Sequence, residues 1–297
     1  MTTPQDSNLI SLVLLVRPLK QTENKLPIWW GSAAHNLLLQ TIKTADESLA
    51  KTYHDEQSIR PFSVSTLMGR FPERKFSDDF TYLLRFTGIN KEVTKILYNA
   101  HQPNGLLAPG SIIELDHLNF QIENAFCDHE AHSFADTSSY PELVSRSMLS
   151  SQPPANDICF QFNSPTYFSS EKTQSPRNKQ FPFPLPDLIF GSLLDRWNAF
   201  GLLAFPPELR KYAAECLLIK RFDLKSRRIP VVGGIQIGMV GKVVFVTSNY
   251  DRYWMSLLHV LADYAFYSGV GAKIAFGLGQ AQKVEGRKLE QDRTFIT

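Results

Sequence analysis

The sequence contains seven histidines, the side chains best suited to moving protons at neutral pH. An imidazole changes its charge close to neutrality, so it can serve as a general acid or a general base. The candidates are His35, His54, His101, His117, His129, His132 and His259. His117 alternates within an expected strand, and His259 lies beside apolar residues of an expected amphipathic helix. We therefore expect structural roles for these two.

A glycine-rich segment near the end of the chain could bring backbone N–H groups close to an anion. Gly269, Gly271, Gly277 and Gly279 lie between an expected helix and an expected strand, with Lys273 among them. This order excludes the dinucleotide and phosphate-loop fingerprints, which need a strand, a loop and then a helix. Glycine permits positive φ and close backbone approach, and the lysine adds a charge. The other interpretation is a connector that lets the last helix pack tightly.

Basic residues gather in the second half of the chain. They join or flank two expected strands, residues 217–224 and 234–247, and the basic stretch 225–228 connects the two. The cluster consists of Lys220, Arg221, Lys225, Arg227 and Arg228. Because the net charge of the whole chain is only +2, such a local cluster indicates a partner with a phosphate backbone. An ordinary solvated hairpin with charged edges is the alternative. Lys172, Arg177 and Lys179 form a looser second patch.

The cysteines and one histidine pair could suggest a metal site. His129 and His132 follow Cys127 and Asp128, but no fourth ligand is evident and the segment has the composition of a solvated loop. We expect neither a metal nor a cofactor. The three cysteines, Cys127, Cys159 and Cys216, are widely separated, which argues against a disulfide framework and favours a reducing compartment.

The elements that must position these residues follow one order in the first half. The pattern of apolar residues predicts a strand at 9–17, a helix in two pieces over 32–53, strands at 62–67 and 81–86, a helix from Asn90 to Ala100, and an extended stretch at 112–126. Asn90 can cap its helix. The order β-α-β-β-α-β is the ferredoxin-like pattern.

The second half repeats this order after a polar stretch at 128–156 that suits a connection between domains. Strands are expected at 158–162, 217–224, 234–247 and 280–287, with helices at 187–200 and from Asp251 onward; residues 207–218 are expected as a helix or a passage from helix to strand. The chain is thus expected to be an α+β protein of two tandem ferredoxin-like (RRM-like) domains with antiparallel sheets. The expected domains are residues 1–153, with His35 and His54, and residues 154–297, with the basic hairpin and the glycine-rich loop.

The composition agrees with two globular domains. The chain has 297 residues, of which 43% are hydrophobic and 20% charged, so it has enough apolar material for two cores. The apolar run Leu9–Val16 is too short to span a membrane, and no basic leader precedes it. We expect a cytoplasmic protein without a membrane partner.

The glycine-rich tail resembles the C-terminal signature of the RAMP-type CRISPR endoribonucleases, whose members end in a G-x-G-x-x-x-x-x-G-x-G pattern. Further landmarks agree with this family in their order along the chain: residues 31–39, 49–54, 60–65, 162–168 and 190–198. The resemblance therefore extends over most of the chain.

This resemblance implies two ferredoxin-like domains and a metal-independent endoribonuclease that cuts CRISPR precursor RNA within each repeat. Without a metal, the 2′-hydroxyl of the RNA is the nucleophile, which leaves 2′,3′-cyclic phosphate and 5′-hydroxyl ends on mature guide RNAs. His54 lies at the family's catalytic position, and His35 lies where some relatives carry a second active-site histidine. Arg60 lies where relatives place a phosphate-binding lysine. Leu39 and Gln40 stand where the family commonly has a tyrosine, so the complete catalytic set stays open.

The resemblance also implies partners. These are CRISPR repeat RNA in the form of a short stem-loop, subunits of a CRISPR effector complex, and a second copy of the chain. The RNA would be held by the basic hairpin and by Gly269, Gly271, Lys273, Gly277 and Gly279. Two alternatives remain: a non-catalytic repeat-RNA-binding subunit of an effector complex, and an enzyme that binds a nucleotide or phosphometabolite at the glycine loop.

Overall fold

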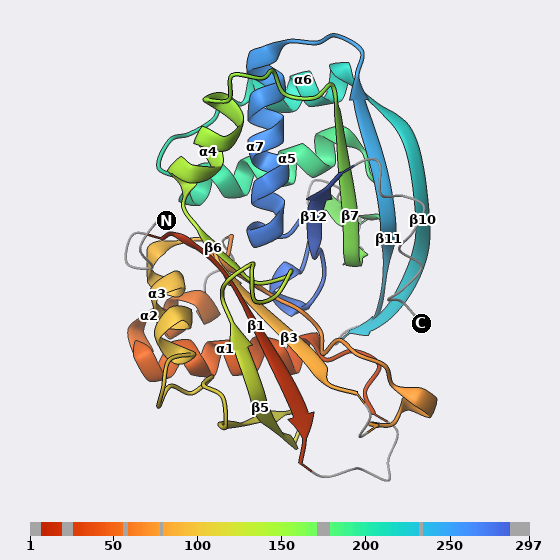
Figure 1. Ribbon diagram of the computed structural model, residues 1–297. Helices are drawn as coiled ribbons and strands as arrows, with labels where there is room; N and C mark the ends of the chain where they lie inside the picture. Colours follow the sequence, from red (N-terminus) through yellow and green to blue (C-terminus); the bar gives the residue numbers. More distant parts are fainter. Residues whose placement is uncertain are drawn as a thin grey trace. The chain divides into compact units, whose positions relative to one another are not determined.

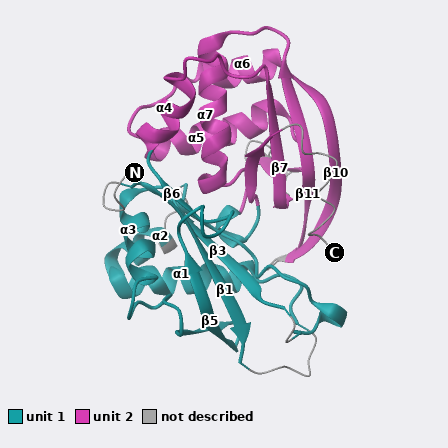
Figure 2. Cartoon of the chain, viewed as in Figure 1, with its two compact units in different colours: residues 1–139, 274–278 teal, residues 140–273, 279–297 magenta. Residues whose placement is uncertain are grey.

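The computed structural model describes residues 7–19, 26–55, 59–77, 80–170, 179–231 and 234–285. The chain forms two compact units, which Figure 2 distinguishes by colour. Unit 1 comprises Met1–Ser139 and Ile274–Leu278, and unit 2 comprises Tyr140–Lys273 and Gly279–Thr297. The middle of the glycine-rich tail therefore belongs to the N-terminal unit, although the residues on either side of it belong to the other.

Unit 1 has the ferredoxin-like order of elements. Its helices are α1 (Gly31–Ala45), α2 (Glu47–Asp55) and α3 (Lys91–Ala100), with short 3-10 turns η1 (Pro72–Arg74) and η2 (Ile274–Phe276). Its strands are β1 (Leu9–Pro18), β2 (Phe62–Val64), β3 (Tyr82–Gly88), β4 (Ile112–Leu115), β5 (Leu118–Phe126) and β6 (Asp136–Ser138). They form one antiparallel sheet in the order β2-β3-β1-β5-β4, with β6 paired to β1 (Figure 1).

The first strand is buried on both faces, as its continuous apolar run predicted. Alternate residues of β1 belong to the core cluster that α1 and α3 complete: Ile10, Leu12, Leu14 and Val16 from the strand, Leu38 and Ile42 from α1, and Val93 and Leu97 from α3. Every second residue of the strand thus faces residues that recur about every 3.6 positions along the two helices. The same core includes Ala50 and Tyr53 of α2, so it holds both α1, which carries His35, and α2, which carries His54.

Two helices of unit 1 begin at polar residues that cap them. The Asn90 side chain accepts a hydrogen bond from the Val93 N–H at 2.9 Å, as predicted. The Asp46 carboxylate accepts from the Leu49 N–H at 3.0 Å, and this bond together with the Ser48 hydroxyl lowers the pKa of Asp46. The charged break seen in the sequence is therefore the start of α2, the helix that contains His54.

The extended stretch expected at 112–126 is a hairpin rather than one strand. It is divided by Asp116 and His117, whose φ values are 49° and 65°. The expectation that His117 lies within a strand is wrong, because it occupies the turn, where its side chain is 94% exposed. Both residue types tolerate left-handed backbone better than most, which explains why the chain reverses here.

Unit 2 repeats the order of unit 1. Its helices are α4 (Tyr140–Met148), α5 (Pro186–Phe200), α6 (Glu208–Cys216) and α7 (Arg252–Ser268). Its strands are β7 (Asp157–Thr166), β8 (Phe168–Ser170), β9 (Lys179–Phe181), β10 (Leu217–Val231), β11 (Gly234–Thr247) and β12 (Ala281–Val284). The main sheet has the antiparallel order β10-β11-β7-β12, so the expected tandem ferredoxin-like class is confirmed. No helix in the described part of the chain is long and apolar enough to cross a membrane.

The basic stretch at 225–228 lies inside a long strand and does not connect two strands. Pairing between β10 and β11 continues without interruption from Arg221↔Val244 to Val231↔Gly234. The expected turn is wrong because the basic residues alternate between the two faces of the hairpin, an arrangement that a strand accommodates as well as a loop does.

The polar stretch at 128–156 contains structure of its own. It supplies β6, which pairs with β1, and α4, which packs against α7. Tyr140 and Leu143 are buried, and the Tyr140 ring lies 4.9 Å from that of Trp197. These apolar anchors attach α4 to unit 2, so the compact units divide between Ser139 and Tyr140, earlier than the expected division after residue 153.

Candidate active site

The glycine-rich tail has the backbone conformation that its composition predicted. The φ values are 68° at Gly269, 83° at Gly271, 89° at Gly277 and 69° at Gly279. Lys273 also has positive φ, 54°, and its side chain is exposed. Glycine adopts this region at little cost, whereas a residue with a Cβ is strained there. The segment is therefore a tightly turned connection between α7 and β12.

Several N–H groups of the tail already donate to acceptors within unit 2. Gly271 donates to the Ser192 hydroxyl at 2.9 Å, Ala272 to the Tyr167 carbonyl at 2.9 Å, and Gly279 to the Pro165 carbonyl at 3.1 Å. These N–H groups do not point toward an open anion site, in contrast to what the glycine spacing suggested. The bonds anchor both ends of the tail in unit 2.

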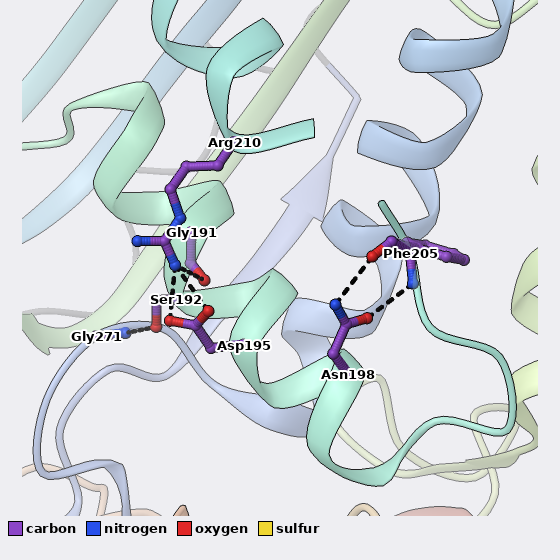
Figure 3. A network of polar contacts seen from close by, with 7 residues as sticks. All are labelled: Gly191, Ser192, Asp195, Asn198, Phe205, Arg210 and Gly271. Carbon is purple, nitrogen blue, oxygen red and sulfur yellow. Dashed lines mark hydrogen bonds and ion pairs between the residues drawn. The ribbon is translucent and has the colours of Figure 1, made fainter. Parts of the chain in front are cut away.

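Two segments that carry the family resemblance are now explained by these bonds. Residues 162–168 offer the carbonyls that hold the tail, and residues 190–198 are consecutive turns of α5, most of whose side chains are buried. Figure 3 shows Ser192 directed at the tail and Asp195 directed at Arg210 of α6, whose guanidinium lies 2.7 Å from both carboxylate oxygens. The role of both segments is to support the tail and the helices around it.

The middle of the tail, Ile274–Leu278, packs into unit 1. The Trp29 indole N–H donates to the Phe276 carbonyl at 2.8 Å, and Gly277 forms a parallel bridge with Ser65. Ala275 is 4% exposed and belongs to the core of unit 1. These contacts place the Phe276 ring beside α1 and the segment before β2, the two parts of unit 1 where the sequence predicted site residues.

Gly31, the first residue of α1, leaves the space that the tail occupies. A Cβ at this position would lie 1.8 Å from the Phe276 carbonyl oxygen and 2.5 Å from the Trp29 Nε1. We expect Gly31→Ala to lower the free energy of unfolding by about 1–3 kcal/mol, because the tail must shift. Helix propensity alone predicts the opposite sign, a gain of about 0.5–1 kcal/mol. Urea denaturation distinguishes the two, with the exposed neighbour Ser32→Ala as the control; a stabilised Gly31→Ala variant would contradict the proposed close fit.

His35 and Arg60 both contact the Phe276 ring. His35 lies on α1 and is 6% exposed, and its imidazole centroid lies 4.3 Å from that of Phe276. The Arg60 guanidinium carbon lies 5.6 Å from the same ring, a cation–π distance. Partial burial lowers the pKa of Arg60. The structure thus gathers an imidazole and a guanidinium at one aromatic side chain.

His54 lies near the end of α2, and its side chain lies outside the described residues. The preceding Tyr53 is 8% exposed, and its hydroxyl accepts a hydrogen bond from the Asn90 amide at 3.1 Å. The Phe62 ring lies 5.8 Å from Tyr53 and 6.0 Å from His35. Tyr53 therefore fixes α2 against the core near Phe62, and, as a core residue, it does not replace the tyrosine that the family commonly has.

Three further histidines, His101, His132 and His259, have structural contacts. His259 is 6% exposed and bonds the Ala155 carbonyl through Nε2 at 2.9 Å, which agrees with the structural role expected for it, and burial lowers its pKa. His132 accepts from the Phe134 N–H at 3.1 Å. His101 lies 3.5 Å from the Cys127 sulfur; burial lowers the pKa of the imidazole and raises that of the thiol. Among the described residues, no group of three or more His, Cys, Asp or Glu side chains could hold a metal ion.

The basic residues of β10 are divided between the two faces of the sheet in unit 2. Val243 pairs with Phe160, whose ring contacts Phe190 of α5, so this face is the one that the helices cover. Successive residues of a strand alternate between the two faces, and paired residues share a face. Val244, Lys242, Val240 and Gly238 of β11 therefore lie on the face opposite to Val243. Their face also carries Arg221, Lys225 and Arg227 of β10. Lys220 lies at a bulge, 3.4 Å from the Asp157 carboxylate. The face that no helix of the described residues covers therefore carries four cations and one carboxylate, since Asp223 lies between Arg221 and Lys225 and pairs with Lys242.

Comparison with known proteins supports the resemblance seen in the sequence. A family model described as CRISPR-associated endoribonuclease Cas6 matches residues 160–281. The structure is similar to the product complex of a Thermus thermophilus Cas6, with 25% identity, 94% of this chain and 100% of that chain covered, and a TM-score of 0.75. A search of curated proteins found no match.

Two further structures show how widely the fold is shared. The match to another Cas6 product complex has 24% identity, covers 93% of this chain and 99% of that chain, and has a TM-score of 0.73. A Cas6-related protein from Pyrococcus furiosus is 14% identical, with 94% and 100% coverage and a TM-score of 0.59. The fold of this chain is the Cas6 fold, and the expected resemblance is confirmed.

Proposed function

We propose, from this resemblance to the Cas6 endoribonucleases, that the chain cleaves CRISPR precursor RNA within each repeat and releases mature guide RNAs. The observation that carries the proposal is the group at Phe276, where His35 and Arg60 come together. An imidazole can move a proton and a guanidinium can neutralise a phosphate, which are the two needs of RNA cleavage without a metal. The glycine-rich tail, which carries the family resemblance, also supplies the Phe276 ring that contacts both side chains.

The proposed reaction uses the 2′-hydroxyl of the RNA as the nucleophile. Its oxygen attacks the adjacent phosphorus while its proton passes to a base, and the 5′-oxygen leaves with a proton from an acid. The products are a 2′,3′-cyclic phosphate and a 5′-hydroxyl, so no water is consumed in this step. His54 and His35 are the proposed acid and base, and Arg60 stabilises the charge on the phosphorane.

RNA binding is assigned to unit 2 and the tail. The proposed contacts are Lys220, Arg221, Lys225, Arg227, Arg228, Gly269, Gly271, Lys273, Gly277 and Gly279. Three of the strand residues share the helix-free face with Lys242, an arrangement suited to successive phosphates. Because several glycine N–H groups are bonded within the protein, the glycines would act by allowing close approach of the backbone.

The two expected domains have different proposed roles. Residues 1–153 contain the proposed catalytic residues, and residues 154–297 contain the proposed RNA-binding residues. Solved relatives include Cas6 proteins with a product or a substrate mimic, and a RAMP protein that binds different RNA substrates. For this chain we propose a repeat stem-loop as the substrate, in the cytoplasm. Effector-complex subunits and a second copy of the chain are further proposed partners.

The test is to incubate the protein with its cognate repeat RNA in the presence of a chelator. We expect a single cut at an undiminished rate and, by mass spectrometry, 2′,3′-cyclic phosphate and 5′-hydroxyl ends. Loss of cutting on chelation with recovery on adding a divalent cation would overturn the 2′-hydroxyl mechanism. Tight binding of the repeat without any cutting would instead favour a non-catalytic subunit, and tight binding of a free nucleotide would favour a small-molecule enzyme.

A further inference from the structure

We propose that Phe276 is a positioning residue, which holds the His35 imidazole and the Arg60 guanidinium in their reactive arrangement. This inference rests on the proposed function and adds a residue to it. The two groups belong to separate elements, since His35 lies on α1 and Arg60 precedes β2. The ring of Phe276 contacts both, with a centroid separation of 4.3 Å to the imidazole and 5.6 Å to the guanidinium carbon.

The backbone of Phe276 is fixed well enough to serve this purpose. Its carbonyl accepts the Trp29 indole N–H at 2.8 Å, and the next residue, Gly277, bridges to Ser65. A Cβ at Gly277 would lie 3.0 Å from the Thr66 nitrogen and 3.0 Å from the Trp29 ring, so the tail is in close contact here. With the backbone held on both sides, the ring has little freedom to leave the imidazole.

The chemistry of the two neighbours explains why an aromatic ring suits this place. A ring face attracts a guanidinium and also packs against an imidazole, so one side chain can orient both without competing for their hydrogen-bonding atoms. A small displacement of a proton-transfer group is enough to slow a reaction strongly. An aliphatic side chain of similar volume would fill the space but would lose the attraction for the cation.

The experiment compares Phe276→Leu with Phe276→Tyr and with a matched control, Phe71→Leu. Phe71 is a partly buried phenylalanine of the same unit whose ring contacts are to Phe76 and Tyr82. With enzyme in excess over repeat RNA, we expect Phe276→Leu to slow the cleavage step by about tenfold or more. We expect its affinity for RNA to change much less, and Phe276→Tyr to recover most of the rate.

A second readout does not depend on catalysis. The Phe276 ring shifts the NMR signals of the His35 ring protons through its ring current, and we expect Phe276→Leu to remove this shift while Phe71→Leu leaves it in place. The proposal is overturned if Phe276→Leu cleaves as fast as Phe71→Leu, or if Phe276→Tyr is as slow as Phe276→Leu. If the unaltered protein does not cut repeat RNA, the proposed function itself fails, and an altered NMR signal then shows only a packing role.

Discussion

Replacing His54 with alanine is expected to slow cleavage of the repeat RNA by about 10²–10⁴-fold, the usual contribution of a positioned proton-transfer group. The same change at His35 is expected to have a similar effect. Affinity for the RNA should stay close to that of the unaltered protein, because the cations of β10 that we propose as phosphate contacts are untouched. Single-turnover cleavage and filter binding, measured on the same preparations, separate the two quantities.

The control for both variants is His117→Ala. His117 lies in the turn between β4 and β5 with its side chain 94% exposed, so its replacement removes an imidazole without affecting the core. His35 is 6% exposed, and its removal also costs packing against Phe276 and Phe62; thermal unfolding of His35→Ala therefore has to accompany its rate.

The double variant gives further information. If the two histidines act as one acid–base pair, losing both should cost little more than losing one. If the His54→Ala variant cuts as fast as His117→Ala, then His54 is not a catalytic residue. If that variant and His35→Ala both cut normally, the proton transfers must be performed by other groups.

A 2′-deoxy substitution at the nucleotide on the 5′ side of the cut is expected to block cleavage completely. The substitution removes the nucleophile itself, so no residual rate through the proposed path is available, whereas loss of a protein side chain only slows that path. The RNA should bind normally, because one missing hydroxyl leaves every phosphate in place.

The matched control is the same substitution one nucleotide farther from the cut. That RNA should be cleaved at nearly the normal rate, since its reacting hydroxyl is intact. Cutting of the substituted RNA at the original position would show that water or another external nucleophile attacks, and the acid–base assignment of both histidines would then need a different reaction. The blocked RNA also provides the ligand for measuring affinity without cleavage.

Local patterns in the sequence were sufficient for most of the elements. The continuous apolar run at residues 9–17 predicted β1, and Asn90 predicted the start of α3 through the bond that it makes to Val93. Such signals lie within a few residues of each other, so they can be read without the rest of the chain. One exception was a turn: Asp116 and His117 reverse the chain without a glycine or proline to mark the place. Another was the polar stretch at 128–156, which contains β6 and α4.

The site could be predicted only in part. The resemblance singled out His35 and Arg60 individually, and their common contact with Phe276 was not predictable from either segment. Trp29, which holds the Phe276 carbonyl, was missed; its only signal was its place two residues before the first helix. The two tryptophans at 29 and 30 have different roles, because Trp30 packs into the core of unit 1.

For the glycine-rich tail, the sequence by itself determined the residue types and hence the positive φ at Gly269, Gly271, Gly277 and Gly279. It also determined the family that this spacing resembles. Only the tertiary structure decided what the tail contacts: its ends donate N–H groups within unit 2, and Phe276 joins Trp29, 247 positions away in the chain. The physical reason is that backbone conformation is set by each residue and its neighbours, whereas a hydrogen bond or ring contact between distant segments exists only after both units have packed.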